Sequence, residues 1–156
     1  MMALVPENDF LIALRERLKS GGTVAFLNGC FDALHEGHLR CIIKAAEVAS
    51  QVVIAVNDDA YILSQKKRQP MNNSIERVGA LMQNEHVREA FVFSDPDPVR
   101  LIAMLKPDFV VKGPDYRGVA LPEQQAIDEV GARLVICEDI KTISSTQIYE
   151  GFHNKP

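Results

Sequence analysis

Two histidines, His35 and His38, stand three residues apart with Gly37 between them, shortly after Gly29. Gly29 allows a tight backbone turn. A helix that begins after this turn would carry both imidazoles at its N-terminal end, where free N–H groups and the helix dipole favour an anion. Imidazoles would add donors to phosphoryl oxygens as negative charge develops. Because two of the four histidines fall in this one segment, we interpret it as a phosphate-binding turn rather than as two unrelated surface histidines.

Charged residues follow the second apolar run of the chain. The acidic pair Asp58–Asp59 could cap a helix or form a turn, or it could orient the loop that follows. The basic triplet Lys66–Arg68 is expected in a long polar loop. A charge run is usually a solvated surface, but in an acidic protein a basic loop near a phosphate site can hold anionic groups. Arg77, on the next expected helix, could reach the site or face water.

Two later segments also carry polar side chains directly after an apolar run. Lys112, Asp115 and Tyr116 follow a predicted strand end and are more typical of a ligand-facing loop than of a plain connector. The hydroxyl residues Ser144–Thr146 open the last predicted helix, near Ser145. They could cap that helix or bind phosphate, because both uses draw on the same free N–H groups.

Short β-branched runs alternate with stretches of helical spacing along the chain. The expected strands are Thr23–Leu27, Val52–Val56, Ala90–Phe93, Phe109–Val111 and Leu134–Ile136. The expected helices are Asp9–Ser20, His38–Ser50, Ser74–Gln83, Pro98–Leu105 and Pro122–Val130. This alternation predicts an α/β fold, a Rossmann-like doubly wound sheet of about five parallel strands flanked by helices. In such a sheet the ligand lies beyond the carboxyl ends of the strands, where strand order reverses.

Composition narrows the class of protein. The chain of 156 residues is expected to form a single domain, with an N-terminal helix in residues 1–21 and a catalytic core in residues 22–152. Its net charge of −4 argues against non-specific nucleic-acid binding, which needs a broad basic face. No apolar run suggests a membrane span or a signal peptide. The three cysteines lack CxxC spacing, which favours reduced thiols and a cytoplasmic location over a zinc site.

The residues in these segments resemble a known family. NGCFDALHEGH, at residues 28–38, is similar to the signature of the cytidylyltransferase-like nucleotidyltransferases, which carry an HxGH motif. VNDD, the basic loop ending in Pro70, the Glu76-Arg77 pair, VKGPDYRG and ISSTQI follow in the family's order, so the resemblance spans Thr23 to Phe152. NGCFD, VND, KRQP and VKGPDY most resemble the adenylyltransferase branch that makes ADP-heptose. The arginine of the RTEG segment found in the glycerol-3-phosphate branch is absent, and Lys141 lies in the corresponding stretch.

The resemblance implies a nucleotidyltransferase reaction. A nucleoside monophosphate would pass from an NTP, ATP in the first instance, to a phosphorylated sugar such as heptose 1-phosphate, with release of pyrophosphate. The acceptor phosphate is already anionic near neutral pH, so catalysis is expected to rest on positioning and charge stabilisation. Mg²⁺ is expected as cofactor, held mainly by the phosphates rather than by a protein cage. Relatives are commonly dimers, so a homodimer is expected by resemblance alone.

The resemblance also implies roles for individual residues. The expected catalytic residues are His35, His38, Lys66 and Lys67. The expected nucleotide-binding residues are Asn28, Gly29, Cys30, Phe31, Asp32, Gly37, Lys112, Gly113, Asp115, Ser144, Ser145 and Thr146. The expected contacts to the acceptor are Asp58 and Arg77.

Three alternatives remain open on the sequence. A CTP-dependent cytidylyltransferase acting on glycerol 3-phosphate or phosphoethanolamine would use the same motifs, and so would an FMN adenylyltransferase. A nucleotide-binding regulatory module without catalysis belongs to another class. The intact His35 and His38 argue against that module, whereas the absent RTEG-type arginine favours it.

Overall fold

A computed structural model describes residues 7–138 of the chain. Its centre is a five-stranded sheet in which every neighbouring pair of strands is parallel, in the order β3-β2-β1-β4-β5. The strands are β1 (Val24–Gly29), β2 (Gln51–Asn57), β3 (Val87–Phe93), β4 (Phe109–Lys112) and β5 (Arg133–Ile136). The chain runs outward from β1 to β3 and then crosses back to β4 on the other side of β1. Strand order therefore reverses between β1 and β4, and the predicted Rossmann-like doubly wound α/β class is confirmed.

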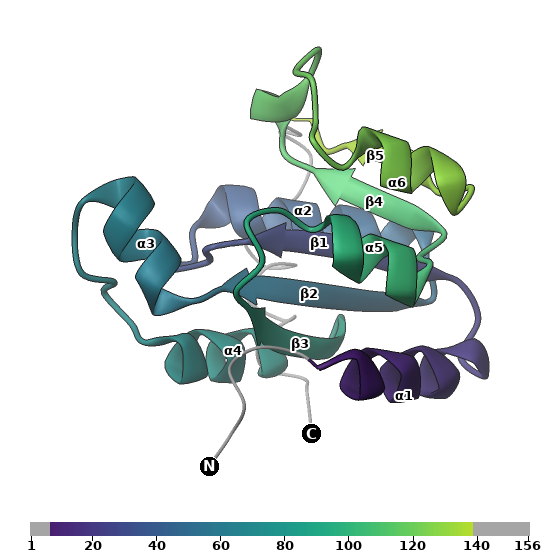
Figure 1. The fold of residues 1–156 in the computed structure, drawn as a ribbon, viewed down its shortest axis with the longest axis horizontal. Helices are drawn as coiled ribbons and strands as arrows, with labels where there is room; N and C mark the ends of the chain where they lie inside the picture. The colour runs from purple at the N-terminus through teal and green to yellow at the C-terminus, as the bar shows by residue number, and fades with distance from the viewer. Residues whose placement is uncertain (1–6, 139–156) are drawn as a thin grey trace.

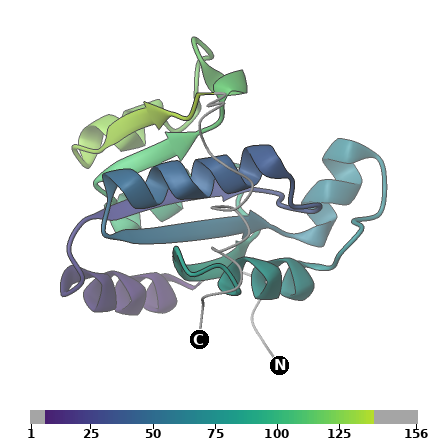
Figure 2. The ribbon, with the colours of Figure 1, turned by 180° about the vertical axis from the view of Figure 1, so that it is seen from behind.

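Helices cover both faces of this sheet (Figures 1 and 2). They are α1 (Asn8–Lys19), α2 (Glu36–Val48), α3 (Asp59–Lys66), α4 (Ser74–Met82), α5 (Val99–Leu105), α6 (Gln124–Glu129) and a short 3₁₀ helix, η1 (Pro114–Tyr116). One apolar cluster joins the sheet to α1, α5 and α6, and the other joins it to α2 and α4. No helix in residues 7–138 is long and apolar enough to cross a membrane.

The strand β2 shows why these segments form a sheet buried on both sides. All its residues are buried, and successive side chains enter opposite clusters. Val53 and Ala55 pack on the α1–α5 face, whereas Ile54 and Val56 pack on the α2–α4 face. This alternation follows from the two-residue period of a strand. An unbroken apolar run is therefore what the central strand needs, which is why the sequence pattern predicted it.

The prediction of a long polar loop after the second strand was wrong, because residues 59–66 form the helix α3. Asp58 starts this helix, since its side chain accepts a hydrogen bond from the Tyr61 N–H at 2.8 Å. Lys67 ends it in the left-handed conformation, with φ of 58°. Only Ile62 of α3 is buried, so the segment lacks the apolar stripe by which a helix is recognised in a sequence. The last predicted helix, near Ser145, lies outside the described residues.

Candidate active site

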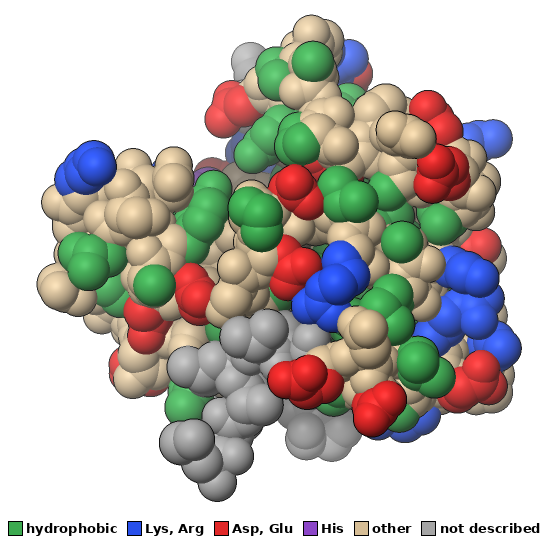
Figure 3. All heavy atoms as spheres, in the orientation of Figure 1, with side chains coloured by type: hydrophobic (Ala, Val, Ile, Leu, Met, Phe, Trp, Pro, Cys, Tyr) green, Lys and Arg blue, Asp and Glu red, His purple; other side chains and the backbone are tan. Residues whose placement is uncertain are grey.

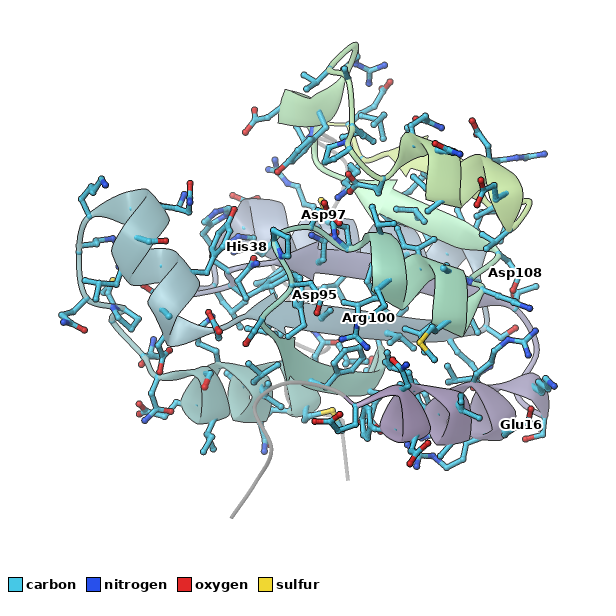
Figure 4. The ribbon with its side chains drawn as sticks, in the orientation of Figure 1. Glu16, His38, Asp95, Asp97, Arg100 and Asp108 are labelled. Carbon is cyan, nitrogen blue, oxygen red and sulfur yellow. The ribbon has the colours of Figure 1, made fainter. Side chains whose placement is uncertain are left out.

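The predicted site residues of β1, β4 and α2 gather at one edge of the sheet. Asn28 and Gly29 end β1, and Lys112 ends the neighbouring strand β4. The N-terminus of α2 follows β1 at this edge, and Figure 4 shows His38 there, toward α3. In Figure 3 a notch separates the side chains of α3 from those of η1, and histidine side chains are visible at its back. The edge lies at the reversal of strand order, where doubly wound sheets bind ligands.

The two histidines cap α2 and each other. The Nδ1 atom of His35 accepts from the Gly37 N–H at 3.0 Å and from the His38 N–H at 3.4 Å. In return, the His38 Nδ1 atom accepts from the His35 N–H at 3.4 Å, which closes a capping box. Since both Nδ1 atoms are acceptors, each neutral imidazole carries its proton on Nε2. The box therefore fixes both rings as Nε2–H donors at the positive end of a helix.

Packing holds the two rings in a stack. The imidazoles of His35 and His38 lie 3.7 Å apart between centroids and 20° from parallel, and the Phe31 ring lies 5.0 Å from His38. A Cβ atom on Gly37 would come within 2.9 Å of His35 Cε1, and one on Gly29 would come within 3.1 Å of the Phe31 ring. Both glycines are therefore needed for the stack. Phe31 itself is buried in the left-handed conformation, with φ of 49°, a strained backbone state of the kind found at functional sites.

His38 is held in its neutral form. Burial, chiefly, and the neighbouring His35 together lower its pKa to about 4, although a hydrogen bond with the Ala33 backbone opposes the shift. A charged His38 would also repel a charged His35 across the stack. At neutral pH, His38 is therefore a neutral hydrogen-bond donor rather than a fixed positive charge.

Asp32 ties the turn before α2 to the loop before α4. Its carboxylate accepts from the Arg68 guanidinium at 2.7 Å and from the Met71 and Asn72 N–H groups at 2.9 and 3.0 Å. The Asn72 side chain donates back to the Asp32 carbonyl at 2.8 Å. Burial would raise the pKa of Asp32, but the hydrogen bonds from Met71, Arg68 and Asn72 outweigh it and lower the pKa to about 2. Asp32 is thus an ionised anchor whose oxygens are already occupied by the protein.

Arg77 neither faces water nor extends to the surface. Its side chain is 1% exposed, and it donates to the carbonyl oxygens of Cys30 at 2.7 Å and Asn57 at 2.6 Å. Further bonds reach the Asn72 carbonyl at 3.1 Å and the Asp59 carboxylate at 2.7 Å. These partners come from the ends of β1 and β2, from α3 and from the loop before α4. Arg77 therefore holds four segments of the site together; its predicted contact with the acceptor stays a prediction.

Lys112 is likewise buried and paired. Its ammonium group lies 2.6 Å from a carboxylate oxygen of Glu123 and 2.8 Å from the Asn28 side-chain oxygen. The Tyr116 ring covers it, with the ring centre 5.2 Å from Nζ. Not all the basic residues that the sequence suggested for the site are therefore free cations, since Arg68, Arg77 and Lys112 are each neutralised by a carboxylate.

Lys66 and Lys67 are exposed at the end of α3, and among residues 7–138 neither forms an ion pair, unlike the exposed Arg68. The charge of Lys66 reaches the site, because it counteracts the burial that raises the pKa of the Cys30 thiol. Asp58 serves as the cap of α3 and also accepts a hydrogen bond from Ser94. Asp115 is exposed on η1.

The remaining predicted residues divide into two groups. Gly113 follows β4, and a Cβ there would meet only the Cys41 sulfur, at an ordinary 3.9 Å. Among the described residues, no contact therefore requires a glycine at this position, which lies at the carboxyl end of β4. Ser144, Ser145 and Thr146 lie outside the described residues.

Two contributors to the site were not singled out in the sequence. Glu123 was read only as part of an expected helix, and Asn72 was not considered. The Pro–Glu start of that helix was the one available signal for Glu123, since helix starts favour acidic residues. Nothing in the sequence pairs Glu123 with Lys112, or Asn72 with Asp32, because these contacts exist only in the folded chain.

The fold and the stacked histidines at the strand switch point define a nucleotide-binding α/β domain of the HxGH type. The family model described as cytidylyltransferase-like matches residues 26–151. The chain therefore belongs to the cytidylyltransferase-like family of nucleotidyltransferases, as expected from its motifs.

Curated relatives agree with this assignment. The bifunctional protein HldE of Streptomyces coelicolor is 36% identical over 149 residues, covering 94% of this chain and 32% of that protein. The bifunctional protein HldE of Desulfatibacillum aliphaticivorans is 31% identical over 152 residues, covering 97% of this chain and 31% of that protein. The chain thus spans about a third of the length of these relatives.

Solved structures share the fold at low sequence identity. The lipopolysaccharide core biosynthesis protein from Thermoplasma volcanium matches with a TM-score of 0.60 at 20% identity, over 76% of this chain and 96% of that one. Pantoate-beta-alanine ligase from Francisella tularensis, complexed with beta-gamma ATP and beta-alanine, matches with a TM-score of 0.62 at 16% identity, over 98% of this chain and 77% of that one.

Proposed function

We propose that this domain transfers an adenylyl group from ATP to a sugar 1-phosphate, of the heptose 1-phosphate type, and releases pyrophosphate. The observation that carries the proposal is the capping box of His35 and His38, which directs both Nε2–H groups away from the backbone of the helix N-terminus beside the strand switch point. The Nε2–H of His38 also has the Ala33 backbone within reach, so it would be shared with, or transferred to, a phosphate. Such an arrangement suits a triphosphate. The resemblance of NGCFD and VKGPDY to the ADP-heptose branch supports the sugar phosphate as acceptor.

In this reaction a phosphate oxygen of the acceptor attacks the α-phosphorus of ATP. The bond from that phosphorus to the bridging oxygen breaks, and pyrophosphate leaves with the electron pair. The attacking oxygen carries no proton at neutral pH, so the protein needs no general base. His35 and His38 donate to phosphoryl oxygens as charge builds up, and the exposed Lys66 and Lys67 attract the anionic reactants.

Mg²⁺ fits this scheme as an ion carried by the triphosphate. Within residues 7–138 no three acidic, histidine or cysteine side chains gather as a metal-binding group. Asp32 and Asp59 are engaged by arginines. The phosphates would therefore supply most of the oxygen ligands, and the ion would neutralise part of the charge on them.

Pyrophosphate release tests the proposal. The assay crosses ATP, CTP, GTP and UTP with heptose 1-phosphate, glycerol 3-phosphate, phosphoethanolamine and FMN, each with Mg²⁺. Release with ATP and the sugar phosphate is expected, and His38→Ala should lower its rate ~10²-fold or more, since it removes one preorganised donor. Release only with CTP and a small phosphorylated alcohol would replace the proposal by the cytidylyltransferase alternative. Tight nucleotide binding without release from any acceptor would indicate a regulatory module.

A further inference from the structure

We propose that the buried ion pair Lys112–Glu123 is a positioning device, which orients the Asn28 side chain so that its NH₂ group meets an uncharged acceptor on the nucleotide. The inference rests on the proposed function and adds to it a specificity role for three residues. On this inference Lys112 does not bind a phosphate directly. The residues at the switch point instead contact the nucleoside part of the ligand, that is, the ribose or the base.

The contacts around Lys112 leave it little freedom. Its side chain is 5% exposed and that of Glu123 is 3% exposed, and their charged atoms lie 2.6 Å apart. The second contact of the ammonium group is the Asn28 oxygen, at 2.8 Å. The register of β4 on β5 and a hydrogen bond from the Cys137 N–H to the Lys112 carbonyl hold the backbone below it. The lysine is therefore fixed from both its backbone and its tip.

This contact decides the orientation of the Asn28 side chain. An ammonium group has no acceptor, so the side-chain oxygen of Asn28 must face Lys112 and the NH₂ group must turn away from it. Asn28 is half-buried at the end of β1. Among residues 7–138 its NH₂ group donates to no acceptor, and it is not fully buried. A polar donor that is held in one direction beside a ligand-binding edge has the geometry of a recognition group.

The same contacts explain why a phosphate is not the expected partner. The charge of Lys112 is neutralised by Glu123, and the Tyr116 ring covers the ammonium group, while Tyr116 is itself 45% exposed. A ligand at this point therefore meets a neutral NH₂ group and the aromatic ring rather than a free cation. The free cations, Lys66 and Lys67, lie at the end of α3. Phosphates are drawn to the α2 and α3 side, which leaves the uncharged part of the nucleotide for Asn28.

Stability alone does not account for this ion pair. Removing two charges from water costs several kcal/mol per ion, and apolar pairs of similar volume are often as stable as buried ion pairs or more so. A Lys112–Glu123 pair at the ligand edge therefore has a further use if it holds a partner in a required orientation. Asn28 is that partner.

The test measures binding of nucleotide and of tripolyphosphate by calorimetry. The main variant combines Lys112→Met with Glu123→Met, because Lys112→Met alone would leave a buried carboxylate unpaired and could unfold the chain. We expect this variant to bind ATP ~10-fold more weakly, because Asn28 loses its fixed orientation and with it one neutral hydrogen bond to the nucleotide. Tripolyphosphate binding should stay as in the wild type. Asn28→Ala should likewise weaken the binding of ATP but not that of tripolyphosphate. The triple variant should bind ATP no more weakly than Asn28→Ala or the Lys112→Met/Glu123→Met variant, because all three substitutions remove the same contact.

An ion pair away from the site provides the control, since Arg17→Gln breaks the pair between Arg17 of α1 and Glu89 of β3 and should change neither affinity. Unchanged ATP binding by the double variant would overturn the inference, as would additive losses with Asn28→Ala. A parallel loss of tripolyphosphate binding would make Lys112 a phosphate ligand and overturn it as well. If the wild type binds none of ATP, CTP, GTP and UTP, the proposed function falls together with the inference.

Discussion

The helices α2 and α4 begin with the same reciprocal capping geometry but build it from different side chains. At α4, the Asn73 oxygen accepts from the Glu76 N–H at 2.9 Å, and the Glu76 carboxylate accepts from the Asn73 N–H at 3.0 Å. At α2, the Nδ1 atoms of His35 and His38 take the same two places. Asparagine and glutamate at these positions are an ordinary way to start a helix. Imidazoles are therefore not required for capping itself.

The difference lies in what remains after the cap is made. The side chains at α4 spend their acceptors on the backbone and leave a carboxylate, which would repel an anion. Each imidazole at α2 uses its Nδ1 atom as the capping acceptor and carries a hydrogen on Nε2, and the Nε2–H of His38 already has the Ala33 backbone within reach. The α2 box therefore satisfies the helix end and still offers donors to an anionic ligand. Capping and ligand binding use opposite sides of the same ring.

The largest expected effect comes from making α2 resemble α4. His35→Asn combined with His38→Glu keeps two capping acceptors but removes both imidazole Nε2–H donors and adds a negative charge. We expect the pyrophosphate-release rate to fall ~10²-fold or more, while the midpoint of thermal unfolding stays close to that of the wild type. Asn73→Ala at α4 is the matched control. It should lower stability by ~1 kcal/mol and leave the rate at saturating substrate unchanged. A doubly substituted α2 with full activity would remove the histidines from the mechanism.

A smaller effect is expected when alanine replaces the glycine of each helix, Gly37 in α2 and Gly79 in α4. Gly37→Ala places a Cβ 2.9 Å from the His35 ring, whereas a Cβ on Gly79 in α4 would meet nothing within 4 Å. The His35 ring can move aside, so Gly37→Ala should leave thermal stability nearly unchanged but lower the rate ~10-fold or more, because a displaced donor loses its alignment. Gly79→Ala should raise stability by up to ~1 kcal/mol with no change in rate. Equal rates for the two variants would show that the position of the His35 ring does not matter.

The last effect concerns pH and only the α2 box. The pKa of His38 is lowered to about 4, chiefly by burial, and in an unfolded chain it would be ~6.5. Between these values the unfolded chain binds a proton that the folded chain does not. The free energy of unfolding should therefore fall as pH is lowered from ~6.5 to ~4 and should lose nothing further from this group below that.

Urea unfolding of the wild type and of His38→Gln across this range measures the effect. Asp32, whose pKa is lowered to about 2, loses its contribution as pH falls below ~4, and it does so in the wild type and the variant alike. The variant should show a flatter dependence than the wild type. Identical slopes would contradict the shifted pKa of His38.

The features of the fold and the site that could be predicted are those that leave a local pattern in the sequence. The strand β2 and the HxGH turn are local: an unbroken apolar run and two histidines around a glycine are visible in the sequence. The helix α3 was missed because one buried residue, Ile62, leaves no apolar stripe. Charges also misled the prediction, since a sequence shows Arg77 and Lys112 as cations but not the carboxylates that neutralise them. Those partners are brought together only by the crossovers between strands.

The anchoring of the loop before α4 has a consequence for the divergence of the family. Asp32 holds this loop largely through the main-chain N–H groups of Met71 and Asn72. Main-chain donors are present whichever side chain occupies position 71, and Met71 is 73% exposed. Substitutions there can therefore accumulate without loosening the loop. A fixed backbone beneath a variable side chain lets the surface of this loop change while the turn before α2 keeps its anchor.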